Sequence, residues 1–391
     1  MAAESARKFE ALEVQATNLL DVFKRAGYEQ VAPSIIQPAD ILLDQIGESI
    51  RSRTYVFTDL AGDALCLRPD LTVPVSRLYL ERHPDADTPA RYCYNGPAFR
   101  FQPDGNNQAH PREFRQAGIE SFGAKDKESA DVETVLLAVE AVRSAGLKDF
   151  RLHFGDISLF YAFVDALALP ERWRLKLRHY FWRPPVFHAL LSRLARGERP
   201  DAEGAVAALA RTLDRDDPER SEELVARYLD EKGLPLAGNR TLSEITARLL
   251  DLLGDLRAEP LRKEVATVID YFLAVSASPK GAVERIAMIA KGAGIDLAPP
   301  LQALVRRFER LEQDGLDLDK STFATEFGRS FEYYSGLVFQ IEVEGEHDAG
   351  QIAGGGRYDG LLADIGAPRE VPAIGAAIHT ERLLATVERS A

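Results

Sequence analysis

Two stretches that are near neighbours in the chain decide the fold: YNGPAFR at 94–100 and REFRQAGIE at 112–120. They predict strands at 91–101 and 114–122, joined by a polar loop that contains proline and glycine. Gln116 and Glu120 are four residues apart, so both side chains are expected, together with Arg100, on one surface of the sheet. Polar groups on a half-buried face are costly unless they meet a polar ligand. The hairpin therefore indicates a ligand site, with an ordinary solvated strand face as the alternative.

The rest of the sheet is expected to come from the far end of the chain. Apolar residues with helical spacing occupy 5–27 and 129–144, whereas strand signals return only at 337–343 and 373–378, before a short terminal helix. We therefore expect an α+β fold, in which an antiparallel sheet is assembled from both ends of the chain and helices pack on it.

The middle of the chain has a different composition. It is rich in Leu, Ala, Arg and Glu with helical spacing, and it is broken by prolines. We predict a mainly helical domain at 170–319, inserted between two parts of a core at 1–169 and 320–391.

Composition limits the class of protein. The 391 residues carry a net charge of −13, which argues against a nucleic acid as the main partner. Two cysteines, Cys66 and Cys93, lie in strand-like apolar runs and are expected to be buried free thiols. The charged first residues do not fit a signal peptide, and no apolar stretch approaches the length of a membrane span. We expect a cytoplasmic protein that does not bind a membrane.

A second segment, 67–72, carries a carboxylate and a hydroxyl at Asp70 and Thr72. On an extended chain two such residues point to the same side and can accept hydrogen bonds from an ammonium group. A turn or a helix cap is the alternative interpretation.

Two further segments lie near the C-terminus. Arg329 offers a two-pronged donor for a carboxylate, and Tyr333 and Tyr334 follow it with flat apolar faces and hydroxyl tips. The run of glycines at 354–356 would let a ligand approach bare backbone, although such a run is also typical of a loop.

Taken together and in their order along the chain, the segment 67–72, the hairpin and the two C-terminal segments resemble the histidyl-tRNA synthetase family of class II synthetases. The resemblance covers 14–154 and 327–383. The resemblance implies a class II core, with an antiparallel sheet flanked by helices. It also implies a histidine pocket. Asp70, Thr72 and Gln116 would meet the amino group, Arg329 the carboxylate, and Glu120, Tyr334 and Tyr358 the imidazole. The full expected set is Asp70, Thr72, Arg100, Gln116, Glu120, Arg329, Tyr333, Tyr334 and Tyr358.

The nucleotide half of the synthetase pattern is altered. Arg100 and Arg382 match the two arginines that contact phosphates in that family, and Phe114 matches the ring that stacks on adenine. However, Gln102 replaces a glutamate, His379 replaces a glycine, and Asp70 is one methylene shorter than the usual glutamate. The resemblance therefore implies a vestigial nucleotide site at Gln102, Phe114, His379 and Arg382.

The chain ends nine residues after Arg382, so the anticodon-binding domain of a synthetase is expected to be missing. A synthetase-like body without that domain is similar to the family of ATP phosphoribosyltransferase regulatory subunits. That similarity implies a subunit without catalytic activity, required for the first step of L-histidine biosynthesis and mediating feedback inhibition by histidine.

The implied partners are a short-form ATP phosphoribosyltransferase catalytic subunit, L-histidine, and a second copy of the chain within a hetero-oligomer. No cofactor, metal or tRNA is expected. One alternative is an active truncated synthetase or another amino-acid adenylating enzyme. Another is a different regulatory paralogue that senses histidine or binds RNA.

Overall fold

The structure is a computed structural model, and it describes residues 5–45, 48–102, 111–198, 204–234, 241–327, 332–343 and 350–390. The chain forms two compact units. The first consists of Met1–Phe163 and Phe272–Ala391, and the second of Val164–Tyr271.

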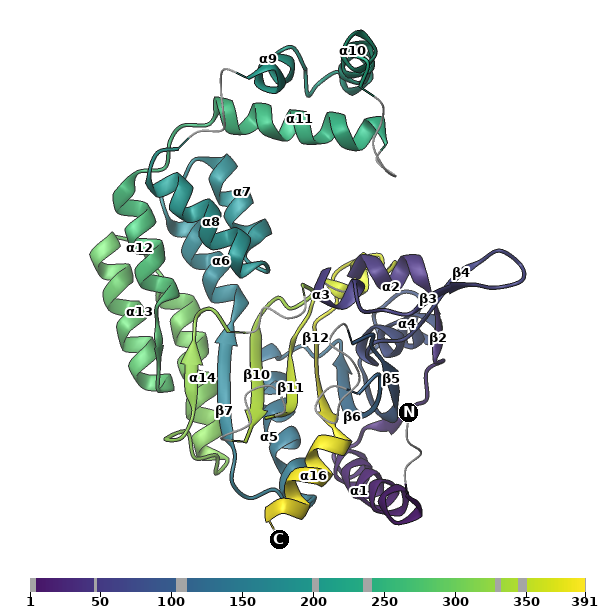
Figure 1. The fold of residues 1–391 in the computed structure, drawn as a ribbon. Helices are drawn as coiled ribbons and strands as arrows, with labels where there is room; N and C mark the ends of the chain where they lie inside the picture. The colour runs from purple at the N-terminus through teal and green to yellow at the C-terminus, as the bar shows by residue number, and fades with distance from the viewer. Residues whose placement is uncertain are drawn as a thin grey trace. The chain divides into compact units, whose positions relative to one another are not determined.

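A large sheet forms the centre of the first unit (Figure 1). Within the described residues it has nine strands in the order β1-β5-β6-β12-β11-β10-β7-β9-β8. The strands are β1 (Glu29–Gln30), β5 (Ala90–Phe99), β6 (Glu113–Phe122), β7 (Arg151–Asp156), β8 (Ser276–Ala277), β9 (Thr322–Ala324), β10 (Leu337–Glu342), β11 (Gln351–Arg357) and β12 (Ala373–His379). All neighbours are antiparallel except β1–β5 and β7–β9. The predicted α+β fold, with a sheet built from both ends of the chain, is confirmed.

The pairing of β6 with β12 joins the two ends of the chain. In its register Gly375 lies opposite Glu120, and His379 lies opposite Gln116. A Cβ atom on Gly375 would lie only 1.6 Å from Oε2 of Glu120, so only glycine leaves room for this carboxyl group. The register therefore determines where the polar side chains of β6 lie.

Helices α1 (Ala6–Arg25), α5 (Lys127–Ser144), α14 (Ala298–Gln313) and α16 (Thr380–Ser390) pack with one another and with the sheet (Figure 1). Helix α1 begins after Ser5, whose side chain accepts from the backbone N–H of Lys8, and it ends before Gly27 at φ +86°. Leu12, Ala16, Leu19 and Phe23 are buried as their spacing predicts. Phe9 belongs to the same predicted stripe but is 48% exposed, with the Arg115 guanidinium over its ring.

A smaller sheet lies beside β5. Its order is β2 (Ile36–Pro38), β4 (Ala64–Leu67) and β3 (Val56–Thr58), and a hairpin connects β3 and β4. The neighbouring helices are α2 (Ala39–Gln45), α3 (Glu48–Arg51), α4 (Thr72–Arg82) and α15 (Leu361–Asp364). The core between this sheet, α4 and β6 includes Tyr79 and Phe122, whose rings stack 4.6 Å apart.

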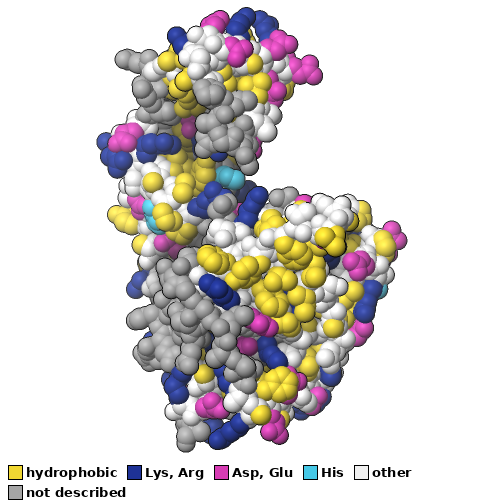
Figure 2. All heavy atoms as spheres, turned by 45° about the vertical axis from the view of Figure 1, so that its right-hand side comes forward, with side chains coloured by type: hydrophobic (Ala, Val, Ile, Leu, Met, Phe, Trp, Pro, Cys, Tyr) yellow, Lys and Arg dark blue, Asp and Glu magenta, His cyan; other side chains and the backbone are white. Residues whose placement is uncertain are grey.

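The small sheet also exposes apolar side chains. Ile36, Val56, Phe57 and Leu60 all belong to its strands or its hairpin tip, and all four are exposed. Figure 2, in which this side of the molecule comes forward, shows hydrophobic side chains gathered on the surface. An exposed apolar patch of this kind is typical of a contact surface.

The second unit is helical. It contains α7 (Glu171–Tyr180), α8 (Pro184–Ala195), α9 (Ala205–Arg211), α10 (Pro218–Glu231) and α11 (Leu242–Arg257), and α6 (Ile157–Ala166) and α12 (Lys263–Leu273) connect it to the first unit. A bond from Arg172 Nε to Asp255 Oδ1, 2.8 Å, and one from Trp173 Nε1 to the Glu259 carbonyl, 2.6 Å, attach α7 to α11 and the segment after it. Among the described helices of both units, none combines the length and the apolar composition that crossing a bilayer requires.

The predicted insert at 170–319 is longer than this second unit. Helices α13 (Pro279–Ala293) and α14 lie in the first unit, because β8 and β9 extend the large sheet and arginines of α14 bind α5. Helical spacing in the sequence could not separate them, since a helix that packs on a sheet shows the same apolar period as a helix of a separate domain.

Replacing Gly375 with alanine should lower the free energy of unfolding by about 1–3 kcal/mol, because the new methyl group overlaps the Glu120 carboxyl group. Gly292 within α13 is the matched control, since a Cβ there would meet nothing within 4 Å. Gly292→Ala should raise stability by about 0.5–1 kcal/mol. Chemical denaturation measures both changes, and equal effects of the two substitutions would contradict the close packing at Gly375.

Candidate functional site

A cavity of about 320 Å³ lies in the first unit, where β6, β10, β11 and β12 meet the segments at 70–72, 100–102 and 333–334. The structure brings together most of the residues that the sequence predicts for a site. Those that line this cavity are Asp70, Thr72, Arg100, Gln102, Phe114, Gln116, Tyr333, Tyr334, Tyr358, His379 and Arg382. Arg329 lies outside the described residues, and Glu120 lies beneath the cavity lining.

Glu120 is 1% exposed and is held between two phenols. The hydroxyl of Tyr94 donates to Oε1 at 3.1 Å, and the hydroxyl of Tyr358 donates to Oε2. Burial raises the pKa of Glu120 to about 8, although hydrogen bonds from Tyr358, Thr72 and Tyr94 oppose the shift. The acid is therefore largely protonated near neutral pH, and it lies in contact with the Tyr358 hydroxyl, whose residue lines the cavity.

On the side of the cavity formed by Asp70 and Gln116, two acceptor atoms lack partners among the described residues. Oδ1 of Asp70 accepts from the backbone N–H of Val73 at 3.4 Å, so this oxygen caps α4 as the alternative interpretation expects. Oδ2 of Asp70 and Oε1 of Gln116 are buried and have no hydrogen-bond partner in the part of the chain that the structure describes. Because buried polar atoms normally find partners, these two oxygens indicate a ligand that donates, such as an ammonium group.

Burial also raises the pKa of the Asp70 carboxyl, while Arg100 and two backbone N–H groups oppose the shift. A cationic ligand placed against Oδ2 would stabilise the charged form. The electrostatics of this side of the cavity therefore also favour a positively charged group.

Tyrosine rings form another wall. Tyr333 packs edge-on against Tyr334 at 5.0 Å and against Tyr358 at 5.8 Å. Gly354 and Gly355 line the cavity as bare backbone. A Cβ on Gly355 would lie 2.3 Å from the carbonyl oxygen of Gly375, so the glycine is required by close strand packing as well as by access. The wall suits a flat ring with polar edges.

The remaining wall is basic. Arg53, Arg100 and Arg382 all line the cavity. Arg100 donates from Nε to the Pro69 carbonyl at 2.8 Å, and Arg382 donates from Nη1 to the Gln351 carbonyl at 3.1 Å. Burial lowers the pKa of Arg100 to about 10, Asp70 opposes this, and the other two arginines add to it.

On this basic wall, the ring of Phe114 contacts the side chains of Arg100 and His379. The Arg100 guanidinium lies 5.0 Å from its centroid, and the His379 ring lies 5.4 Å away at an interplanar angle of 41°. Gln102 accepts from Arg53 and donates to the Pro111 carbonyl at 3.1 Å. His379 and Gln102 thus occupy the positions where the sequence departs from the synthetase pattern, and both contact neighbouring side chains.

Sequence reasoning missed several groups at the site. Tyr94 belongs to the quoted segment 94–100, but its contact with Glu120 depends on the pairing of β5 with β6, where Tyr94 lies opposite Gly118. Arg53 and Glu381 also line the cavity, and Glu381 accepts from the backbone N–H of Arg115 at 2.8 Å. No local pattern could have assigned Arg53, because it comes from the segment before the small hairpin.

Other predicted features can be placed as well. Cys66 and Cys93 are buried free thiols, as the sequence predicts. Among the described residues, no group of three or more His, Cys, Asp or Glu side chains is arranged to hold a metal ion.

The fold is that of a class II synthetase core. A solved structure from Bacillus halodurans, of an ATP phosphoribosyltransferase regulatory subunit/histidyl-tRNA synthetase, is similar to this chain with a TM-score of 0.65. The alignment covers 99% of this chain and 82% of that one. At 19% identity this likeness concerns the fold alone. A histidine–tRNA ligase subunit from Alicyclobacillus acidocaldarius is 25% identical, with a TM-score of 0.61 over 100% of this chain and 96% of its own.

The sequence comparisons identify the family. The histidyl-tRNA synthetase model matches residues 4–223 and 223–383, and the chain belongs to that family. Curated relatives of similar length are ATP phosphoribosyltransferase regulatory subunits. That of Mesorhizobium japonicum is 35% identical over 95% of this chain and 97% of its own length. The regulatory subunit of Brucella anthropi is 34% identical over 91% of this chain and 92% of its own length. The resemblance predicted from the four segments is confirmed.

The raised pKa of Glu120 predicts a pH dependence of stability. The carboxyl group titrates at about 8 when folded and near 4.5 when unfolded, so its contribution is fully present below pH 4.5 and is lost as pH rises through 8. Wild type should lose up to about 1.4 kcal/mol per pH unit from this group across that window. Glu120→Gln should lack this loss.

Urea denaturation at several pH values measures the effect as the difference between variant and wild type. That difference should grow in favour of Glu120→Gln from pH 5 to pH 8. A constant difference would contradict the assignment of a raised pKa to Glu120.

Proposed function

We propose that this chain is the non-catalytic regulatory subunit of an ATP phosphoribosyltransferase and that its cavity binds L-histidine. The regulatory role is supported by relatives that carry this name and align over more than nine-tenths of the chain. Histidine binding is supported chiefly by the pair of buried acceptors, Asp70 Oδ2 and Gln116 Oε1, in the same cavity as tyrosine rings and close to the buried acid Glu120.

Each end of a histidine molecule has a complementary group. Its ammonium group would donate to Asp70 and Gln116, with the Thr72 hydroxyl beside them. Its imidazole would lie among Tyr333, Tyr334 and Tyr358. A neutral imidazole carries one hydrogen-bond donor and one acceptor. Because the pKa of Glu120 is about 8, this carboxyl group can change between its donor and its acceptor form near neutral pH and so match either ring nitrogen. Arg329 remains the expected partner of the carboxylate, and Arg100 offers a further cation in the cavity wall.

The protein would act in the first step of L-histidine biosynthesis. Its partner would be a short-form catalytic chain of ATP phosphoribosyltransferase, and histidine bound in the cavity would inhibit that chain as the end product. We also propose a second copy of this protein within the hetero-oligomer. The exposed apolar face of the small sheet supports a contact with another chain in such an assembly.

Histidine should bind the isolated protein, and Asp70→Asn should weaken that binding by about 1.5–3 kcal/mol, because a charged acceptor for the ammonium group is lost. Asp149→Asn is a matched control, since Asp149 is an exposed carboxylate that does not line the cavity. Titration calorimetry measures both. Equal affinities for wild type and Asp70→Asn would remove Asp70 from the pocket.

The regulatory part is tested with the short catalytic chain. Adding this protein should activate that chain, and histidine should inhibit the mixture. Asp70→Asn should still activate while inhibition shifts to higher histidine concentration. Inhibition that is unchanged in the variant would assign the inhibitory site to the catalytic chain.

A second function, amino-acid adenylation, is favoured by one observation: Arg100 and Arg382 line the same cavity as Asp70. We expect no histidine-dependent exchange of pyrophosphate into ATP by the wild-type chain, because the His379 ring already contacts the Phe114 ring. His379→Gly alone should not restore exchange, since Gln102 and Asp70 also depart from the synthetase pattern. Robust exchange by the wild type would establish an enzyme instead.

A further inference from the structure

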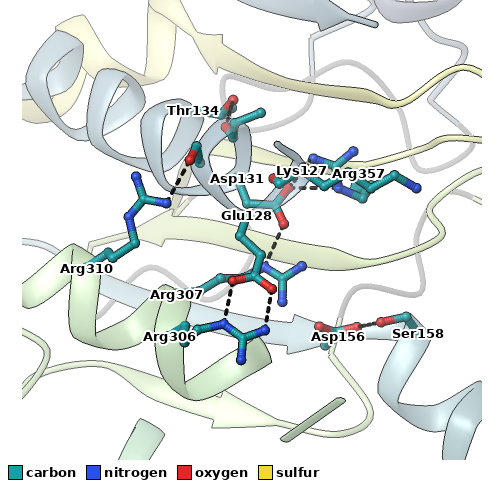
Figure 3. Close-up of polar contacts among 12 residues, drawn as sticks. Lys127, Glu128, Asp131, Thr134, Asp156, Ser158, Arg306, Arg307, Arg310 and Arg357 are labelled. Atoms are coloured by element: carbon teal, nitrogen blue, oxygen red, sulfur yellow. Dashed lines mark hydrogen bonds and ion pairs between the residues drawn. The ribbon is translucent and has the colours of Figure 1, made fainter. Parts of the chain in front are cut away.

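A buried ionic cluster lies outside the cavity, between β11 and the helices α5 and α14 (Figure 3). Its centre is Asp131, which is fully buried. Arg357 donates to Oδ1 of Asp131 from Nε at 2.8 Å and from Nη2 at 2.6 Å. Arg307 of α14 donates to Oδ2 at 2.7 Å. One carboxylate thus binds a strand and a second helix to α5.

Arg357 uses its remaining donors on the same side. Nη1 donates to Oδ1 of Asp359 at 2.8 Å, and Nη2 also donates to the Lys127 carbonyl at 2.9 Å. The planar guanidinium is therefore held at three different residues, which determines its orientation as well as its position. A lysine could keep the charge but not this set of directions.

The backbone around Arg357 forms part of the cavity. Gly354 and Gly355 precede it, and Tyr358 follows it. The hydroxyl of Tyr358 donates to Glu120, and its backbone N–H donates to the Ala373 carbonyl at 2.8 Å. The guanidinium of Arg357 and the phenol of Tyr358 thus belong to adjacent residues at the end of β11.

The same strand end also holds the segment with the other tyrosines. The carbonyl of Arg357 accepts from the backbone N–H of Ser335 at 2.7 Å, and the N–H of Asp359 donates to the Ser335 hydroxyl at 2.9 Å. A Cβ on Gly336 would lie 3.0 Å from Cδ of Arg357, so the arginine stem packs tightly against this segment. Ser335 directly follows Tyr334 in the chain.

Such a cluster has little value as a source of stability alone. Burial raises the pKa of Asp131, and Arg357 and Arg307 oppose the rise. Burial lowers the pKa of Arg357, but Asp131 and Asp359 together bring it above its ordinary value. Because desolvation can cancel the attraction in buried ion pairs, the cluster is weak evidence for stability. What the contacts do show is a fixed geometry, in which the Arg357 guanidinium is bonded to Asp131, Asp359 and the Lys127 carbonyl.

We propose that Arg357 is a positioning residue for the proposed histidine pocket: through Asp131 and Asp359 it holds the end of β11 so that the Tyr358 hydroxyl lies on Glu120. Arg307 of α14 binds the same Asp131 and therefore adds α14 to this restraint. The proposal rests on the proposed function, because it concerns how the cavity recognises the ring of histidine.

A double-mutant cycle tests it, with L-histidine binding measured by titration calorimetry. Arg357→Lys and Tyr358→Phe should each weaken binding about fivefold, which corresponds to one neutral hydrogen bond. If Arg357 acts through the Tyr358 hydroxyl, the double variant should lose only about fivefold to tenfold. A merely structural role would give the product of the two losses, about 25-fold, and this result would overturn the proposal.

Arg306→Gln is the control. Arg306 also lies on α14, but its guanidinium pairs with Glu128 at the surface, 2.6 Å away, whereas it is Arg307 that binds Asp131 (Figure 3). Its affinity for histidine should equal that of wild type. A loss in Arg306→Gln as large as in Arg357→Lys would also reject a specific role for the cluster.

If Arg357→Lys does not fold by circular dichroism, Arg307→Gln replaces it in the same cycle, because it removes one of the two arginines on Asp131 and leaves the cavity lining unchanged. Full additivity with Tyr358→Phe would again overturn the proposal. A wild-type protein that binds no histidine would reject the proposed function itself. A wild type that binds histidine but gives an additive cycle would reject only the role of Arg357.

Discussion

The pairing of β6 with β12 is the constraint on which the rest of the structure depends. It joins strands that are separated by some 250 residues, and its register places Gly375 opposite Glu120. Because glycine alone leaves room there, a carboxyl group can be buried within the sheet and aimed at the Tyr94 and Tyr358 hydroxyls. A shift of one residue would move every side chain of β12 to the other face and remove this arrangement.

The first unit contains two kinds of buried carboxylate, which differ in how many of their oxygens have hydrogen-bond partners among the described residues. At Asp131 each carboxylate oxygen meets an arginine, so the group restrains β11, α5 and α14. At Asp70 one oxygen caps α4 and the other has no partner among the described residues, and Gln116 presents a second such oxygen. Satisfied groups serve to hold backbone, whereas unsatisfied groups in a cavity are available to a ligand.

The basic wall of the cavity explains how a synthetase-like core can serve a different role. Arg100 and Arg382 are present in the cavity, but Phe114 is already in contact with the His379 ring. An aromatic platform that is covered by the protein's own side chains offers less stacking surface to a purine. In the proposed regulatory subunit, the half of the cavity that would recognise an amino acid is retained, and the half that would activate it is altered.

The sequence by itself determined the fold class, the main strands and most of the candidate site, because these depend on residue type and local spacing. Gln116 and Glu120 are four apart on a strand, Asp70 and Thr72 flank a helix start, and all but Glu120 line the cavity. Only the tertiary structure decided that α13 and α14 belong to the first unit and that Phe9 is half exposed under Arg115. The same holds for the contact of Tyr94 with Glu120, the place of Arg53 in the cavity lining and the bond of Arg357 to Asp131. The physical reason is distance along the chain: Asp131 and Arg357 are 226 residues apart, and only the register of the sheet and the packing of its helices bring such groups together.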